Sequence, residues 1–345
     1  MRTISARLLH WFDQYGRHDL PWQSEPANPY HVWLSEIMLQ QTQVTTVIDY
    51  FNRFIRAFPS IKALAQAEED AVLAQWAGLG YYARARNLQC SAKIMLKNHG
   101  GEVPNSMEQL LALPGIGEST AGAILSLAYE QPHAILDGNV KRVLARYHQV
   151  SGHYEQNSII KHLWQLSKQH TPNKRNKDYT QAVMDLGATV CVRSQPKCSI
   201  CPLQDDCQAC QNQTQSQYPQ PRPKKVKPTK TVAMLIFRNK KGWVYLEKRP
   251  NKGIWSGLWS FPECKNTPDA IHTAIQAFAH NTGQQDYLPI FKHTFTHYHL
   301  DIQPIVINID NAGSNMGQHF YSPQQSDLGL PSPITKIIAQ LFTKE

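Results

Sequence analysis

The chain contains 345 residues, about two domains at roughly 150 residues each, which is enough to bury a sizeable core. Lys and Arg total 35 against 26 Asp and Glu, and this formal charge of +9 predicts an anionic partner such as nucleic acid. The 41% hydrophobic and 18% charged residues exclude a disordered chain, and the lack of a long apolar run or a signal-peptide pattern predicts a cytosolic protein without a membrane partner.

The first two hundred residues are predicted to be helical. Asn28 and Pro29 mark a helix start, with an N-cap residue followed by proline at the first helical position. Gly16 and Pro59 each follow an apolar helical pattern and mark its end. Apolar residues recur at helical spacing in the ranges 4–15, 44–58 and 68–77, and again from residue 83. Helices joined by short Gly/Pro turns predict an all-α domain.

Glu36 is the first candidate catalytic residue. Its helical neighbours include Val32, Trp33 and Leu39, which predicts a partly desolvated carboxyl group with a raised pKa, suited to general-acid work. A buried structural glutamate held by an arginine or a serine is the alternative. The amides that follow at once, Gln41 among them, are suited to reading a base edge or filling a gap in a duplex.

Two aromatic residues, Tyr81 and Tyr82, follow the glycine-rich segment 78–80. Aromatic rings in a nucleic-acid-binding protein can stack on bases or wedge between them. Packing in the core is the alternative for both residues.

The sequence LPGIG at 113–117 lies between two helical patterns, 106–112 and 118–129. Gly115 and Gly117 permit a tight turn, and the N-terminal amides of the second helix favour a phosphate group. An ordinary helix connection is the alternative. In a basic chain, however, this pattern predicts a helix–hairpin–helix clamp on the DNA backbone.

Asp137 is the second candidate carboxylate. It follows the apolar stretch 134–136 and precedes a helical pattern at 140–146, so one expected role is a helix N-cap. Because Asp137 also lies shortly after the hairpin, it is placed to stabilise a cation that develops during a reaction on DNA.

Four of the seven cysteines lie within seventeen residues, although structural disulfides are rare in the cytosol. Cys191, Cys198, Cys201 and Cys207 have the spacing C-x6-C-x2-C-x5-C, which suits a four-iron cluster or a tetrahedral metal site. Exchanging Cys191 for Cys210 gives C-x2-C-x5-C-x2-C, a pattern that suits zinc. Spacing alone leaves iron–sulfur, zinc and unrelated thiols open.

A proline-rich basic segment follows the cysteines. Residues 218–228 hold four prolines and four basic residues without an acidic one, which is typical of an extended linker. Strands are then predicted at 231–237, 243–246 and 291–302, and an amphipathic helix at 334–342. We therefore expect a helical catalytic domain at 1–215 with its cysteine loop at 191–207, a linker at 216–230, and an α+β domain at 231–345.

Taken together, the LPGIG hairpin, Asp137 and the C-x6-C-x2-C-x5-C spacing resemble the helix–hairpin–helix DNA glycosylase superfamily with an iron–sulfur cluster. The segments 20–22, 32–42, 78–87 and 136–146 are similar to MutY-type adenine DNA glycosylases. The resemblance covers nearly the whole chain. It implies a base-excision-repair enzyme that hydrolyses the N-glycosidic bond of adenine mispaired with 8-oxoguanine or guanine in double-stranded DNA.

The resemblance also implies roles for individual residues. Glu36 protonates the departing adenine and later activates water, Asp137 stabilises the oxocarbenium-like sugar, and Asn139 orients this site. A [4Fe-4S] cluster is held by four cysteines, and the enzyme is expected to be a monomer. The cluster ligands implied are Cys191, Cys198, Cys201 and Cys207, and the DNA-contacting residues are Gln41, Tyr82, Leu39, Trp22, Arg17, Gly115, Gly117 and Ser119.

One position separates two subclasses of this superfamily. Lyase-type relatives such as endonuclease III carry a Schiff-base lysine two residues after the second glycine of the hairpin, where this chain has Ser119. We therefore expect a monofunctional glycosylase. A bifunctional endonuclease III-type enzyme and a catalytically silent DNA-binding or redox protein are the competing hypotheses.

The second domain is similar to Nudix domains over the stretch 255–262, but the acidic metal-binding helix is missing from 263–278, so we do not expect nucleotide hydrolysis. In MutY-type relatives this domain recognises the oxidised guanine through a Phe-Ser-His loop, which corresponds to Phe295, Thr296 and His297 here. The sequence predicts His293, His297 and His299 on one strand face, where a metal site or ordinary surface histidines are the alternatives.

Overall fold

The structure is a computed structural model that describes residues 3–154, 156–221, 226–250, 252–279, 282–309, 320–322 and 328–342. The chain divides into two compact units, one formed by Met1–Gln66 and Asn87–Pro223 and the other by Ala67–Arg86 and Lys224–Glu345. None of the helices in the described ranges combines the length and apolar character needed to cross a membrane.

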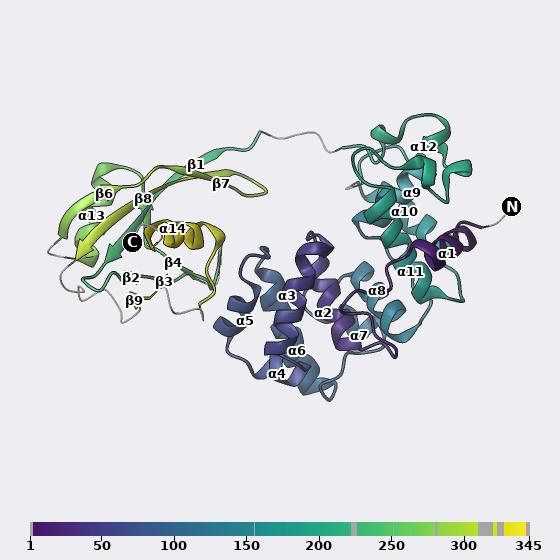
Figure 1. Ribbon diagram of the computed structural model, residues 1–345, viewed down its shortest axis with the longest axis horizontal. Coiled ribbons are helices and arrows are strands. Elements are labelled where there is room, and N and C mark those ends of the chain that lie inside the picture. Colours follow the sequence, from purple (N-terminus) through teal and green to yellow (C-terminus); the bar gives the residue numbers. More distant parts are fainter. Residues whose placement is uncertain are drawn as a thin grey trace. The chain divides into compact units, whose positions relative to one another are not determined.

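The first two-thirds of the chain is helical, as the sequence predicts (Figure 1). Capping residues explain several boundaries. The Thr3 hydroxyl accepts from the backbone N of Ala6 at the first helix, and Gly16 ends that helix. In chain order the helices are α1 (Ile4–Tyr15), α2 (Pro29–Leu39), α3 (Val44–Ala57), α4 (Ile61–Gln66), α5 (Glu69–Trp76), α6 (Ala83–Asn98), α7 (Met107–Leu111), α8 (Glu118–Tyr129), α9 (Gly138–Tyr147), α10 (Asn157–His170) and α11 (Asn176–Asp185).

Short helical turns follow α11 and carry the cysteine loop. A π-helical turn, η1 (Leu186–Val190), leads directly from α11 into Cys191. Three 3₁₀ turns and one short helix then follow in chain order: η2 (Cys198–Ile200), η3 (Gln204–Asp206), α12 (Gln208–Gln211) and η4 (Gln215–Gln217).

One hydrophobic core joins the first helix of the chain to the later helices of the first unit. Apolar residues of α1 pack against those of α9, α10 and α11, with Leu8, Leu144, Leu163 and Leu186 among the most buried. These positions match the apolar helical spacing in the sequence, because burying one stripe of each helix is what stabilises such a bundle.

A mixed sheet forms the centre of the C-terminal part of the chain (Figure 1). Its strands are β1 (Thr229–Arg238), β2 (Val244–Tyr245), β5 (Glu263–Lys265), β6 (Thr282–Tyr287), β7 (Phe291–Thr294), β8 (His299–Ile309) and β9 (Phe320–Tyr321). The long strands β1 and β8 are parallel and pair from Thr229 with His299 to Arg238 with Asn308. A separate ribbon joins β3 (Glu247–Lys248) to β4 (Trp259–Ser260).

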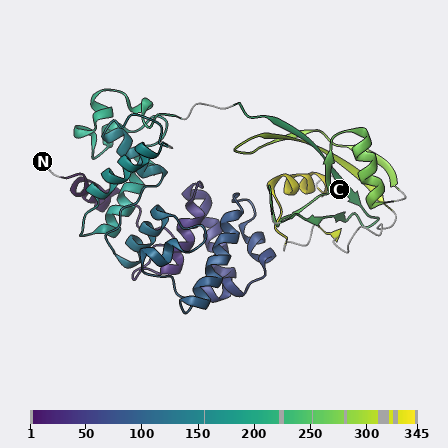
Figure 2. The same ribbon diagram turned by 180° about the vertical axis from the view of Figure 1, so that it is seen from behind.

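Two helices cover opposite faces of this sheet (Figure 1 and Figure 2). Met234 and Ile236 of β1 pack with α14 (Ser332–Phe342), whereas the alternate residues Leu235 and Phe237 pack with α13 (Pro268–Phe278). Both faces of β1 are therefore buried, which explains its uninterrupted apolar sequence. The α+β architecture and the C-terminal helix predicted from the sequence are confirmed.

The prediction of a single strand at 291–302 is wrong. The structure contains a hairpin, in which β7 and β8 pair antiparallel from Phe291 with Ile302 to Thr294 with His299. The connecting turn is closed by a 2.9 Å hydrogen bond from the backbone N of Phe295 to the carbonyl oxygen of Tyr298. The histidines accordingly do not share one strand face: His293 is on β7, His299 is on β8, and His297 is in the turn.

The predicted linker is ordered at both ends. Arg146 donates from Nε to the carbonyl oxygen of Tyr218 at 3.0 Å, and Gly152 donates from its backbone N to Oε1 of Gln220 at 2.9 Å. Strand β1 begins at Thr229. Residues 222–225, at the centre of the predicted linker, lie outside the described residues, so the domain boundaries remain a prediction.

Candidate active site and cysteine cluster

Helix α2 carries Glu36 into the interior of the first unit. Asn28 caps this helix by accepting hydrogen bonds at Oδ1 from the backbone N of Tyr30 at 3.0 Å and of His31 at 3.3 Å. Most of α2 is buried, and Glu36 is half-buried. Burial, and secondarily the nearby Asp137 carboxylate, raise the pKa of Glu36 to about 8. Glu36 is therefore protonated near neutral pH, as a general acid must be.

Asp137 is the N-cap of α9, as the sequence predicts. Its Oδ1 accepts a hydrogen bond from the backbone N of Val140 at 2.7 Å, and its Oδ2 accepts from Nδ2 of Asn139 at 3.0 Å. Burial raises the pKa of Asp137, while these hydrogen bonds and the charge of Arg142 oppose the rise. Capping fixes the carboxylate but leaves lone pairs on both oxygen atoms available to a ligand.

Helix α8 holds the segment that leads into Asp137. The hydroxyl of Ser119 accepts a hydrogen bond from the backbone N of Leu136 at 2.9 Å. A Cβ atom at Gly122 would lie 2.5 Å from the carbonyl oxygen of Ala134, so the helix backbone packs directly against this segment. The hairpin helix and the Asp137 carboxylate are thus parts of one rigid arrangement.

Glu36 and Asp137 differ in how readily each carboxyl group gives up its proton. Since Asp137 contributes to the raised pKa of Glu36, the pair favours a single negative charge. The hydrogen bonds from Val140 and Asn139 and the charge of Arg142 favour the ionised form of Asp137. Because these groups act on Asp137, it is the better stabilised carboxylate of the pair and Glu36 is the better proton donor.

Replacing Glu36 by glutamine is expected to stabilise the fold by about 1–3 kcal/mol at pH 8, with little effect near pH 5. The folded chain keeps a proton on Glu36 up to about pH 8, whereas the unfolded chain loses it near pH 4.5. The free energy of unfolding therefore falls as the pH rises between these values, and glutamine removes this dependence. Thermal unfolding of both proteins at the two pH values measures the effect, and an equal difference at both would contradict it.

Arg142 and Gly187 fix the position of Asn139. Arg142 donates from Nη2 to Oδ1 of Asn139 at 2.8 Å and to the carbonyl oxygen of Gly187 at 2.5 Å, and from Nε to the carbonyl oxygen of Cys191 at 2.7 Å. A Cβ atom at Gly187 would lie 2.5 Å from Cβ of Asn139 and 3.0 Å from its Cα. The π-helical turn therefore presses against the first turn of α9 where only glycine fits.

The Gly187→Ala variant is expected to be destabilised by about 1–3 kcal/mol, because the added methyl group must displace the backbone of Asn139. Such a change lowers the unfolding midpoint by several degrees, which calorimetry detects. Gly138→Ala, in the first turn of α9, is the matched control, since an added Cβ there meets nothing within 4 Å. Equal midpoints for the two variants would show that the close approach at Gly187 carries no strain.

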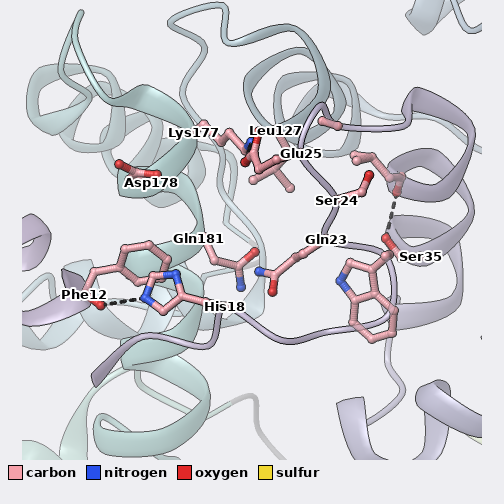
Figure 3. Close-up of a pocket in the computed structure, with 13 residues that line it drawn as sticks. Phe12, His18, Gln23, Ser24, Glu25, Ser35, Leu127, Lys177, Asp178 and Gln181 are labelled. Carbon is pink, nitrogen blue, oxygen red and sulfur yellow. Dashed lines mark hydrogen bonds and ion pairs between the residues drawn. The ribbon is translucent and has the colours of Figure 1, made fainter. Parts of the chain in front are cut away.

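A pocket of about 350 Å³ opens beside α2 in the same unit (Figure 3). Its lining includes Trp22, which the resemblance implies as a base-contacting residue, and Ser35, which directly precedes Glu36. Figure 3 shows polar groups around it from two segments, the loop that contains Gln23 to Glu25 and the start of α11. The other lining residues are Phe12, His18, Ala27, Val32, Leu127, Lys177, Asp178 and Gln181.

A hydrogen-bond chain orients one amide of this pocket. Gln181 donates from Nε2 to Oδ1 of Asp185 at 2.8 Å, and Asp185 is only 1% exposed. Arg17 binds the same carboxylate from Nε at 2.9 Å and from its backbone N at 2.8 Å. Because Gln181 directs its amino group at Asp185, its carbonyl oxygen is the group able to accept a hydrogen bond from a ligand. Arg17 therefore acts through Asp185 and does not line the pocket.

The remaining implied residues of this unit lie at turns. Leu39 ends α2, and Gln41 follows with an exposed side chain and a positive φ of 60°. Gly115 has a φ of 81°, which favours glycine, and an added Cβ would lie 3.0 Å from Cβ of Asn87. Gly117 is the N-cap of α8, so the free amides of that helix begin at the hairpin.

The cysteines of the loop converge on one small cavity of about 30 Å³, lined by Cys191, Cys198, Cys201, Cys207 and Cys210. Burial and the neighbouring thiols raise the pKa of Cys201 to about 12, opposed by a backbone hydrogen bond from Leu203. Within the described part of the chain no three Cys, His, Asp or Glu side chains meet at ligating geometry. Thiols gathered around a cavity are nonetheless the donor set that a soft metal or an iron–sulfur cluster requires.

Tyr82 and the residues of the β7–β8 turn belong to the second unit. Tyr82 is half-buried and accepts a hydrogen bond at its hydroxyl from the backbone N of Gly78 at 3.3 Å. At the β7–β8 turn, Phe295 packs against Trp255 and Tyr298, with ring centroids 5.2 Å and 4.8 Å apart. Thr296 and His297 are exposed at the tip. The turn thus has an aromatic base and a polar tip.

Sequence reasoning missed the polar residues that α11 contributes. Four polar residues of this helix are buried together with its apolar residues: Asn176, Thr180, Gln181 and Asp185. Thr180 lies four residues after Asn176, and Asp185 lies four residues after Gln181, so the helix places each pair side by side. Polar pairs at this spacing in a buried helix were the signal that could have revealed them.

The fold agrees with comparisons to known proteins. A model of the HhH-GPD superfamily of base excision DNA repair proteins matches residues 34–169, and a NUDIX domain model matches residues 232–340. A solved structure of a thermostable thymine-DNA glycosylase is 27% identical, with a TM-score of 0.54, and covers 60% of this chain and 95% of its own. These matches define a base-excision-repair enzyme with a Nudix-type second domain.

Relatives over the full chain narrow the class further. The adenine DNA glycosylase of Buchnera aphidicola subsp. Baizongia pistaciae is 41% identical over 97% of this chain and 95% of its own length. That of Mus musculus is 34% identical over 90% of this chain and 71% of its own. The chain belongs to the adenine DNA glycosylase family, which confirms the resemblance seen in the sequence.

Proposed function

We propose that this enzyme hydrolyses the N-glycosidic bond of adenine opposite 8-oxoguanine or guanine in duplex DNA. The observation that carries this proposal is the protonated Glu36 beside the ionisable Asp137, on the rigid elements α2 and α9. Adenine is a poor leaving group until it is protonated, and a positioned acid supplies about 10²–10⁴-fold in rate. A protonated glutamate is the group that this reaction needs first.

Each carboxyl group has one task in the proposed reaction. The adenine leaves the base stack, and Glu36 donates its proton to the base as the glycosidic bond breaks. Asp137 stabilises the positive charge that develops on the sugar, while Asn139 keeps its carboxylate in place through the 3.0 Å hydrogen bond. Glu36, now ionised, takes a proton from the water that attacks the sugar.

The pocket beside α2 suits the extruded base. Trp22 offers an aromatic side chain, and the carbonyl oxygen of Gln181 can accept a hydrogen bond from the exocyclic amino group of adenine. Guanine and thymine present a carbonyl oxygen where adenine presents this amino group. Gln181 therefore favours adenine over both of these bases in the pocket.

DNA binding draws on the hairpin and on the overall charge of +9. The free N-terminal amides of α8 beyond Gly117 favour a backbone phosphate, and Gly115 allows the close approach that such a contact needs. With Ser119 at the position of the lyase lysine, the reaction ends at base release without a Schiff base. We expect the protein to act as a monomer on double-stranded DNA.

The thiols Cys191, Cys198, Cys201 and Cys207 fit a [4Fe-4S] cluster, because all four line the same cavity. Such a cluster supplies a rigid cross-link between the four cysteines when it is bound. Arg142 reaches from the carbonyl oxygen of Cys191 to Asn139, so the loop also supports the site. Iron and sulfide analysis with a visible absorption spectrum separates the cluster from zinc.

Release of adenine from duplexes tests the function. We expect release opposite 8-oxoguanine and guanine, little release opposite thymine, and no strand scission or borohydride-trapped complex. Duplexes with each other base opposite 8-oxoguanine serve as controls. Release of oxidised pyrimidines with strand scission would instead identify a bifunctional endonuclease III-type enzyme, and absence of any release would identify a silent DNA-binding protein.

His297→Ala is expected to reduce the preference for 8-oxoguanine over guanine by about tenfold, since one base-edge contact is worth about 1–3 kcal/mol. We propose that Phe295, Thr296 and His297 read the oxidised base, because the turn presents exposed polar groups on an aromatic base. Relative rates on the two mispairs measure this preference. His272→Ala, an exposed histidine on α13, is the matched control and should keep the wild-type ratio.

A further inference from the structure

Five thiols surround the cysteine cavity, one more than a four-iron cluster binds. Cys210 lies in α12, one helical turn beyond Cys207, and its backbone N donates to the carbonyl oxygen of Cys207 at 2.9 Å. The cavity is lined besides by Arg146 and Gln215, which belong to α9 and η4. One of the five sulfur atoms is therefore left without iron when a four-iron cluster is bound.

Hydrogen bonds to sulfur indicate which thiols are prepared to bind iron. Arg146 donates from Nη1 to Sγ of Cys191 at 3.4 Å, and Gln215 donates from Nε2 to Sγ of Cys198 at 3.7 Å. Cys201 accepts from the backbone N of Leu203.

Cys207 completes the set: the backbone N–H of Cys210, which donates to its carbonyl oxygen, also opposes the rise in the pKa of its thiol. Each sulfur of the predicted ligand set thus has an N–H group beside it, and such groups stabilise metal-bound thiolates. Cys210 lies outside this set and is therefore the thiol left over.

Cys210 lines the same small cavity as Cys198, and a side-chain hydrogen bond joins the two thiols. Cys198 lies at the start of η2, whereas Cys210 lies within α12. Two thiols in contact need only a small movement to reach the sulfur–sulfur bond length.

We propose that Cys210 is a reserve thiol that forms a disulfide with Cys198 when the cluster is lost to peroxide. This inference rests on the proposed cluster. Once iron has left, the two thiols react with one hydrogen peroxide: the sulfur–sulfur bond forms, the O–O bond breaks, and the two thiol protons leave in two water molecules. The thiols are oxidised by two electrons and the peroxide is reduced by two.

The disulfide protects the loop from irreversible damage. A thiolate exposed to peroxide proceeds through sulfenic acid to sulfinic and sulfonic acids, which thiol reductants do not restore. A disulfide between Cys198 and Cys210 stops Cys198 at a reducible stage. Reduction then returns Cys198 intact as a ligand for reloading with iron and sulfide.

The test compares the wild-type holoenzyme with Cys210→Ser and with Cys90→Ser, an exposed cysteine on α6 that serves as control. Iron content is measured first. Each protein is then treated with hydrogen peroxide until its visible absorption is lost, and free thiols are alkylated. A protease that cleaves before Asp205 and Asp206 separates Cys198 from Cys210, so fragmentation of a cross-linked peptide pair identifies the disulfide.

We expect equal iron in all three proteins, a Cys198–Cys210 disulfide in the wild type and in Cys90→Ser, and sulfinic or sulfonic acid at Cys198 in Cys210→Ser. After reduction and reloading, Cys210→Ser should recover severalfold less cluster. Loss of iron from untreated Cys210→Ser would make Cys210 a ligand and overturn the proposal. A different disulfide, or none, would also overturn it. Absence of iron from the wild type would instead refute the cluster itself.

Discussion

Base release by the Glu36→Gln variant is expected to be about 10²–10⁴-fold slower than release by the wild type, with binding to mispaired duplex retained. Glutamine matches glutamate in size but has no proton to give to the leaving base. The raised pKa of about 8 makes Glu36 a proton donor at neutral pH, so wild-type activity should fall as the pH rises above about 8. Single-turnover release of adenine across this pH range measures both effects.

The control for this variant is Glu102→Gln, which alters an exposed glutamate outside α2. It should release adenine at the wild-type rate. If Glu36→Gln also released adenine normally, Glu36 would be a structural residue, and another group would have to supply the proton.

The Asp137→Asn variant is expected to lose about 10²–10³-fold in base release, because it removes the negative charge that stabilises the cationic sugar. Asparagine is as good an N-cap as aspartate, so the hydrogen bond to Val140 can persist and the fold should keep its stability. Asp137→Ala removes the charge and the cap together and should also lose about 1 kcal/mol of stability. Single-turnover rates and thermal unfolding separate these two roles.

Asp49→Asn, an exposed aspartate on α3, is the matched control for loss of one negative charge. It should leave base release unchanged. A normal rate in Asp137→Asn together with an unstable Asp137→Ala would show that Asp137 is a helix cap only, which was the simpler interpretation of the sequence.

Local patterns in the sequence predicted much of the fold correctly. Asn28 begins α2, Gly16 ends α1, and Asp137 caps α9, because a cap depends on residues within one helical turn. The apolar spacing found α3 and α14 for the same reason. The β7–β8 hairpin within 291–302 was missed, since its turn contains no glycine or proline to mark it.

The sequence by itself determined the helices, the two candidate carboxylates, the LPGIG hairpin and the spacing of the cysteines. Each of these features depends on residues that lie close together along the chain. Only the tertiary structure decided that Asp137 acts on the pKa of Glu36, that Gln181 is oriented by Asp185 and Arg17, and that Cys210 joins the cysteine cavity. The physical reason is that burial and electrostatic coupling depend on which distant segments pack together, and no local pattern records that packing.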